Sequence, residues 1–199
     1  MYALVTDGTI TKYFNNPKGF TLGDLQYPKD IFMKWSVEEK EAIGIYEVVF
    51  DDSNKKDEAW YINTNQSFAF ASGTVTASYG SATAKAHADR NGTDEDGVDL
   101  DPVVVIEGLK TTLIRTVKTQ AAGILANTDW YITRNAEKST AIPSAISTHR
   151  DAVRTKQAQM ETAITNASNT PALETLYTYT KQSDGTVTRP LGELPTLEI

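Results

Sequence analysis

The sequence predicts an α+β protein in which an N-terminal antiparallel β meander is followed by an α-helical hairpin and a short C-terminal β hairpin. Three observations support this fold class. In the first half of the 199 residues, short β-branched and aromatic runs alternate with turn-forming residues. In the second half, apolar residues recur at steps of three and four, the period of an amphipathic helix. Near the C-terminus, an Asp-Gly pair separates two short β-forming runs, which is typical of a hairpin.

The first predicted element is a hairpin with its turn at Asp7-Gly8, because this pair tolerates the positive φ angles of a tight turn. A short helix is expected to begin after Ser36 and to end before Gly44. Ser36 and Glu39 have the spacing of a capping box, in which each side chain binds the backbone N–H of the other residue. The strands of the meander are then predicted at residues 45–50, 60–62, 67–70 and 74–79.

Two longer helices are predicted in the second half, with a short turn between them at residues 129–132. The first covers about residues 103–127 and carries an apolar stripe formed by Ile106, Leu109, Leu113, Val117, Ala121 and Ile124. The second begins near Pro143, with a stripe formed by Ile146, His149, Val153, Lys156, Met160, Ile164 and Ala167. Neither helix can bury its stripe alone, so we expect each to pack against the other, the β-rich half or another copy of the chain.

These elements divide the chain into four predicted parts. They are a β-rich interaction head (1–88), an acidic linker (89–102), a helical hairpin module (103–176) and a C-terminal β hairpin with an extended tail (177–199). The linker contains Asp94, Asp96, Asp99 and Asp101, whose carboxylates are of the type that binds calcium. Their spacing does not fit an EF-hand loop, because Val103 falls where a bidentate glutamate is required, and a solvated linker is the preferred interpretation.

The composition argues against several functional classes. The formal net charge is −7, and residues 1–100 hold 16 acidic against 9 basic side chains, whereas nucleic-acid binding needs a basic surface. The sequence contains no run of about 18 apolar residues, so we expect no membrane-spanning segment. With no cysteine, two histidines (His87 and His149), no phosphate-binding glycine loop and no nucleophile elbow, we expect no catalytic residue, no metal site and no cofactor.

The most informative side chains for binding lie around the two predicted helices. Trp130, Tyr131 and Arg134 form an aromatic and basic cluster where the first helix ends. One interpretation is a hydrophobic plug that closes the helical hairpin, and the other is a contact anchor, since Trp, Tyr and Arg are enriched in binding hot spots. Arg150 and Arg154 could pair with Glu137 or Asp151, or with a neighbouring subunit. The predicted interface residues are Trp130, Tyr131, Arg134, Ile146, His149, Arg150, Val153, Arg154 and Met160.

Several blocks of the sequence resemble virion proteins of tailed bacteriophages. Three blocks of this chain resemble the helical module of those proteins: residues 128–134 (TDWYITR), 141–143 (AIP) and 149–154 (HRDAVR). Structural proteins of marine phages are similar to residues 2–5 (YALV), 56–64 (KDEAWYINT) and 188–197 (TRPLGELPTL). Such proteins are commonly tail-fibre assembly proteins or tail structural proteins. The resemblance implies a place of work in the phage particle or its assembly, and it transfers no catalytic residue.

From these observations we expect a non-enzymatic structural component of a phage tail, associated with the fibre or the distal tail apparatus. It would be made in the host cytoplasm and would pack with other copies of itself, a trimer being suited to a fibre, and with other tail proteins. Two alternatives remain open. One is an assembly chaperone that leaves before the particle is mature, and the other is a receptor- or glycan-binding module that uses exposed aromatic side chains such as Trp60.

Overall fold

The computed structural model describes residues 1–197, and the chain divides into two compact units between Thr83 and Ala84. The β-rich unit therefore ends slightly before the predicted limit at residue 88. Residues 84–88 belong to the helical unit because they bond to it: the amides of Leu109 and Lys110 donate to the carbonyls of residues 86 and 87 at 2.9 and 3.0 Å. The α+β class, with strands before helices and a C-terminal hairpin, is confirmed.

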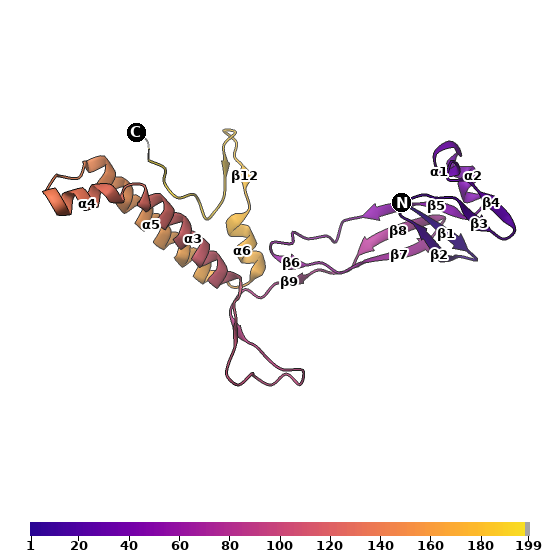
Figure 1. The fold of residues 1–199 in the computed structure, drawn as a ribbon, viewed down its shortest axis with the longest axis horizontal. Helices are drawn as coiled ribbons and strands as arrows, with labels where there is room; N and C mark the ends of the chain where they lie inside the picture. Colours follow the sequence, from indigo (N-terminus) through magenta and orange to yellow (C-terminus); the bar gives the residue numbers. More distant parts are fainter. Residues whose placement is uncertain (198–199) are drawn as a thin grey trace. The chain divides into compact units, whose positions relative to one another are not determined.

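The β-rich unit contains one main sheet with the strand order β2-β1-β5-β8-β7 (Figure 1). Its elements are β1 (Tyr2–Thr6), β2 (Thr9–Phe14), β3 (Phe20–Leu22), β4 (Leu25–Tyr27), α1 (Ile31–Lys34), α2 (Val37–Glu41), β5 (Ile45–Asp51), β6 (Tyr61–Ile62), β7 (Gln66–Ala71) and β8 (Thr74–Tyr79), and the short strand β9 (Thr83–Ala84) contains the boundary with the helical unit. Most pairs in the sheet are antiparallel, but β5 and β8 are parallel, which corrects the predicted antiparallel meander. After β5, the next strand that the chain adds to this sheet is β7, which lies two places away from β5. The chain then turns back, and β8 fills the place between β5 and β7, running parallel to β5.

The main sheet curls until its two edge strands approach each other. The ring centroids of Tyr13 on β2 and Phe68 on β7 are 4.8 Å apart. The interior strand β1 carries buried side chains on both faces, because successive side chains point to opposite sides of a strand. Leu4 packs in one core cluster with the buried aromatic residues of the first hairpins and α1, and Ala3 and Val5 pack in the other with side chains of β5 and β8.

Local sequence signals in this unit act as predicted. Asp7 and the glycine after it have φ angles of 50° and 75°, which fits the expected tight turn. Ser36 and Glu39 form the capping box, with hydrogen bonds of 2.8 and 3.2 Å. Gly44 has a φ angle of +80°, and a Cβ atom there would lie 2.5 Å from the carbonyl oxygen of Val5. Only glycine fits this close approach of two backbone segments.

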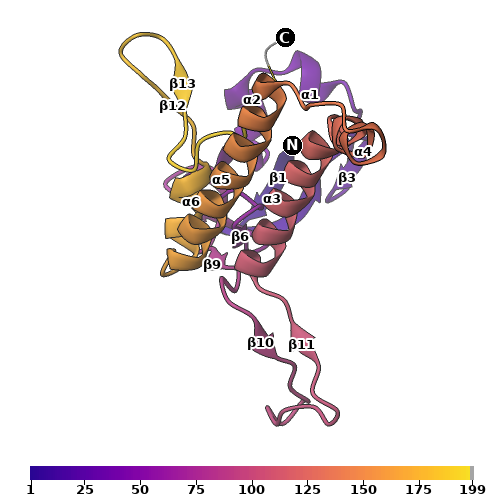
Figure 2. The ribbon, with the colours of Figure 1, turned by 90° about the vertical axis from the view of Figure 1, so that its left-hand side faces the viewer.

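The helical unit is built on two helices that lie side by side, α3 and α5 (Figure 2), which we call the helical pair. Its helices are α3 (Leu109–Ala126), α4 (Asp129–Lys138), α5 (Ser144–Asn166) and α6 (Thr170–Tyr177). The helical pair buries Val117 and Ala121 from α3, and Val153, Met160 and Ile164 from α5, as the apolar stripes predict. The predicted short turn at 129–132 is instead the start of α4.

The first helix begins later than predicted because the β-branched residues 103–106 enter a strand, β11 (Val105–Ile106), which pairs with β10 (Arg90–Asn91). Residues 89–107 thus form a hairpin, here called the arm, that extends from the start of α3 (Figure 2). The expected acidic linker at 89–102 is wrong, because these residues are most of the arm. The carboxylate of Asp94 fixes its tip by accepting from the amides of Asp96 and Val98 at 3.0 and 2.9 Å.

The C-terminal hairpin consists of β12 (Thr180–Lys181) and β13 (Val187–Thr188). The tail after it returns to the helical unit, where Leu191 is buried. Arg189 lies over the rings of Tyr177 and Tyr179, at 5.2 and 5.1 Å from their centroids. Within residues 1–197, none of the helices has the length and apolar character needed to cross a membrane.

Candidate partner-binding surface

The nine predicted interface residues separate into a buried and an accessible group. Ile146, His149, Arg150, Val153 and Met160 are all buried. Their side chains lie inside the helical unit because α3 and the segments around the helical pair already cover the apolar stripe of α5. These five positions are therefore corrected from partner contacts to core residues of the chain itself. Trp130, Tyr131, Arg134 and Arg154 remain exposed or half-buried.

Arg150 holds the corner between α3 and α4 together. Its Nη1 donates to the carbonyl oxygen of Leu125 at 2.8 Å and to the hydroxyl of Thr128 at 2.7 Å. The same nitrogen lies 2.9 Å from a carboxylate oxygen of Asp129. A guanidinium is suited to this place because the last carbonyls of a helix carry partial negative charge. Asp129 is not the partner expected for Arg150, which was Glu137 or Asp151. The expected ion pair of Arg154 with Asp151 is present, at 3.4 Å.

Immediately after this corner, α4 presents the predicted aromatic and basic cluster to solvent. Trp130 is 52% exposed, so it does not plug the helical hairpin, and α4 as a whole contributes no buried residue. The rings of Trp130 and Tyr131 lie with centroids 4.0 Å apart. The guanidinium carbon of Arg134 is 4.5 Å from the Trp130 centroid and 5.4 Å from that of Tyr131. We call these three residues the α4 face.

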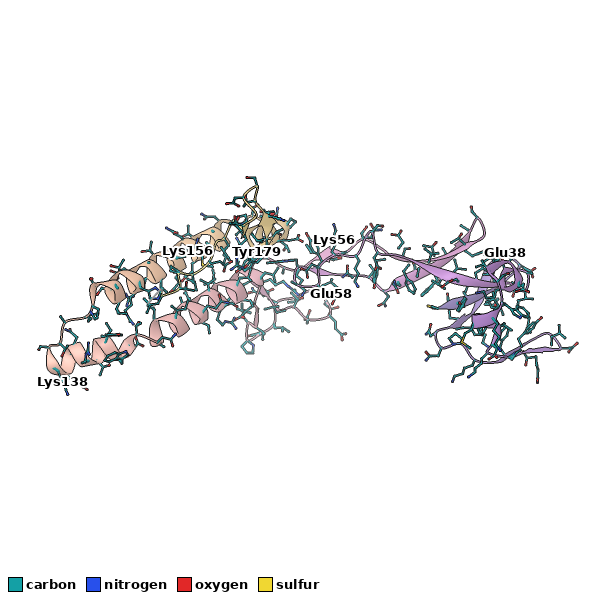
Figure 3. All side chains as sticks on the ribbon, turned by 90° about the horizontal axis from the view of Figure 1, so that it is seen from above. Glu38, Lys56, Glu58, Lys138, Lys156 and Tyr179 are labelled. Carbon is teal, nitrogen blue, oxygen red and sulfur yellow. The ribbon has the colours of Figure 1, made fainter. Side chains whose placement is uncertain are left out.

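The contacts of the α4 face restrict its side chains before any partner binds. Arg134 lies four residues after Trp130, so the two side chains share one side of the helix and can form a cation–π contact. Lys138 ends the same helix and carries a second positive charge (Figure 3). A rigid aromatic and basic surface loses little conformational entropy on association, which favours a role in binding.

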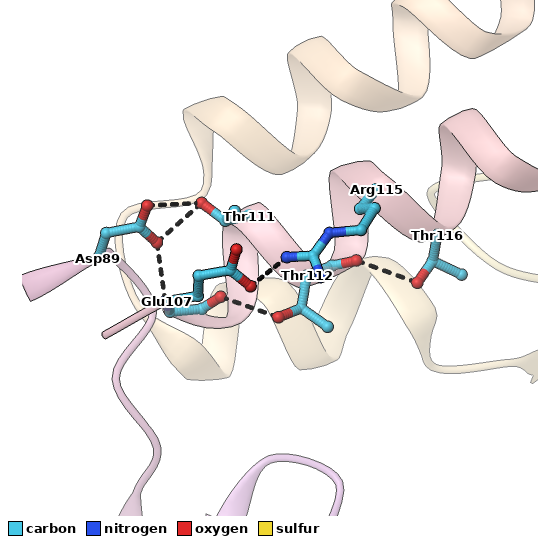
Figure 4. Close-up of polar contacts among 7 residues, drawn as sticks. Asp89, Glu107, Thr111, Thr112, Arg115 and Thr116 are labelled. Atoms are coloured by element: carbon cyan, nitrogen blue, oxygen red, sulfur yellow. Dashed lines mark hydrogen bonds and ion pairs between the residues drawn. The ribbon is translucent and has the colours of Figure 1, made fainter. Parts of the chain in front are cut away.

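A second feature of the helical unit is the polar network that attaches the arm to α3 (Figure 4). The carboxylate of Asp89 accepts from the amide of Gly108 and from the hydroxyl of Thr111, both at 2.7 Å, and Glu107 forms an ion pair with Arg115. The hydrogen bond from the Gly108 amide, followed by that from Thr111, lowers the pKa of Asp89 below its usual value. No short motif predicts this network, because its partners lie up to 22 residues apart in the sequence.

The surface next to the C-terminal tail is hollowed by a cavity of about 590 Å³. Met160 lies at this cavity together with Ile124, Tyr179 and Leu194, so the tail covers part of the apolar stripe of α5. The hydroxyl of Tyr179 donates to Glu193 at 2.6 Å, and this hydrogen bond raises the pKa of the tyrosine.

Within the described residues 1–197, no group of three or more His, Asp or Glu side chains has an arrangement that could hold a metal ion. Comparisons of the chain with family models, curated proteins and solved structures found no match.

Proposed function

We propose that this chain is a non-enzymatic structural component of a bacteriophage tail, associated with the fibre or the distal tail apparatus. Two observations on the same sequence blocks support the proposal. The blocks at residues 128–134, 141–143 and 149–154 resemble the helical module of tailed-phage virion proteins. The first block forms the exposed α4 face, and the third supplies Arg150, which holds that face in position.

The single observation that carries a binding role is the exposure of Trp130 within an ordered cluster. A side chain of this size at 52% exposure leaves a large apolar area in contact with water. Burial of such area against a partner stabilises a complex by roughly 25 cal/mol per Å². The partner would be another copy of the chain or another tail protein.

The test is peptide mass spectrometry of gradient-purified particles of the phage that encodes this chain. We expect the chain to be present at a constant copy number per particle. Replacing Trp130 with alanine should lower this copy number several-fold. Ile132→Ala is the matched control, because Ile132 is an exposed apolar residue of the same helix that lies about 200° around the axis from Trp130.

Two results would contradict the proposal. A chain found in infected lysate but absent from purified particles would point to the assembly-chaperone alternative. Equal copy numbers for Trp130→Ala and the wild type would mean that the α4 face does not bind a partner in the particle. The glycan-binding alternative has less support at the position first considered for it, because Trp60 is buried and offers no exposed ring.

A further inference from the structure

The arm has many apolar side chains that are exposed to solvent. Its exposed aliphatic residues are Val98, Leu100, Val103, Val104, Val105 and Ile106, with exposed fractions between 36% and 61%. An isolated pair of strands is only marginally stable, and its outer backbone groups are open to further pairing. Because successive side chains of a strand point to opposite faces, both faces of the arm carry exposed apolar side chains. Exposed apolar area of this extent is typical of an interaction site.

The arm is nevertheless ordered at both ends. At its base, Asp89 binds Gly108 and Thr111 of the helical unit. A Cβ atom on Gly108 would lie 2.4 Å from the backbone of Ala88, so the two ends of the arm touch closely at this point. Between the strands, Asn91 Nδ2 donates to the carboxylate of Asp99 at 2.8 Å. The arm is thus pre-organised, while its apolar sides are uncovered.

We propose that the arm docks on the helical pair of a second copy of this chain. Charge identifies this partner surface. Residues 89–107 hold seven acidic side chains and one basic side chain, a net charge of −6. Residues 109–166, which include the helical pair, hold eight basic and four acidic side chains, a net charge of +4. Pairing of one arm with another arm would bring like charges together, whereas pairing with the helices brings opposite charges together.

The helical pair has a groove in which the arm can lie. The groove has a volume of about 690 Å³. It is lined by Leu125 from α3 and, from α5, by Arg154, Gln157, Ala158, Glu161, Thr162, Thr165 and Asn166. Ala158 and Thr162 are small, so a strand can approach the helix closely. The side chain of Arg154 is 53% exposed and lies 3.4 Å from Asp151, and Glu161 also lines the groove, so the positive charge that attracts the arm is that of the helical pair as a whole. Because the donor and acceptor surfaces differ, copies that each give one arm and accept one form a closed pair or ring where the rotation between copies closes, and an open filament where it does not.

This inference deepens the proposed function by naming a second copy as the partner, and its test needs only the purified chain. Light scattering coupled to size exclusion, at tens of micromolar protein, should give a defined oligomer in about 0.1 M salt. Association should weaken in about 1 M salt, because the Debye length falls from about 10 Å to about 3 Å.

The first variant is the double replacement Val103→Thr and Val105→Thr, which retains β-branched side chains but reduces the apolar area. We expect the association constant to fall at least about tenfold. Val187→Thr is the matched control, because Val187 has a similar exposure on the other two-stranded hairpin of the helical unit. Its association constant should equal that of the wild type.

The second variant, Arg154→Glu, leaves the arm intact and reverses a charge at the groove. It should also be impaired in self-association. Mixing it with the arm variant should restore a one-to-one complex, because one copy keeps an intact arm and the other an intact groove. Circular dichroism of each variant checks that the fold is retained.

Three results would overturn the inference: a monomeric wild type at every concentration, an arm variant that associates like the wild type, or a mixture that restores nothing. The last would indicate contact between arms or another surface. A monomeric chain that is nevertheless present in purified particles would refute this inference and leave the proposed function standing. A chain that self-associates but is absent from particles would refute the proposed function and leave this inference standing.

Discussion

Replacing Arg150 with methionine is expected to lower the free energy of unfolding of the helical unit by about 2 kcal/mol. Methionine keeps most of the aliphatic packing but removes the contacts of Nη1 with Leu125, Thr128 and Asp129. Hydrogen bonds to charged groups typically contribute about 1.5–3 kcal/mol. The loss should stay below the roughly 3–5 kcal/mol of a fully buried ion pair, because the side chain of Asp129 is 60% exposed and regains water.

The measurement is urea denaturation followed by the helical circular dichroism signal, which comes mainly from α3 to α6. Arg154→Met is the matched control on the same helix, with both variants measured at a protein concentration at which the chain is monomeric, so that self-association does not contribute to stability. Its side chain is 53% exposed and lies 3.4 Å from Asp151, so its effect should stay within about 0.5 kcal/mol. If the two variants lose equal stability, Arg150 does not hold the corner and the reasoning fails.

Two further predictions concern single backbone contacts. Gly44→Ala should destabilise the β-rich unit by about 2–4 kcal/mol, because it combines left-handed backbone strain with a clash against the carbonyl oxygen of Val5. Gly73→Ala is the control, because Gly73 has a similar φ angle but open space around it. In thermal unfolding, its loss of stability should be about half that of Gly44→Ala. For Asp89, the lowered pKa means that its carboxylate stabilises the base of the arm above the usual value of 3.8, and that this contribution is lost as pH falls through the lower folded-state pKa. The chemical shift of the Gly108 amide proton should follow this titration below pH 3.8 in the wild type but not in Asp89→Asn, and a midpoint at or above 3.8 would contradict the assignment.

Local signals in the sequence predicted the local structure well. The capping box at Ser36 and the turn at Asp7 depend on residues within a few positions of each other, so their chemistry is visible in the sequence itself. The apolar period likewise predicted the buried side of α5, including Val153 and Met160. The same stripe was over-interpreted as a partner surface, because periodicity shows that a face is buried and does not show which element covers it.

Non-local features were not predictable in this way. The parallel pairing of β5 with β8 depends on the path of the whole connection between them, which no short motif encodes. The arm was interpreted as a linker because its many acidic residues hide two short strands. The partner of Arg150 was missed because Asp129 lies 21 positions earlier in the sequence and reaches it only after α3 and α5 have packed.

The order of strands in the main sheet has a consequence for synthesis on the ribosome. Every strand of that sheet, from β1 to β8, lies within residues 2–79. Translation therefore completes the full set of strand partners before any residue of the long helices is made. Because domains generally fold as units in the order of synthesis, this unit can acquire its hydrogen-bonded ladder while the helices are still being added, and errors of pairing with later segments are avoided.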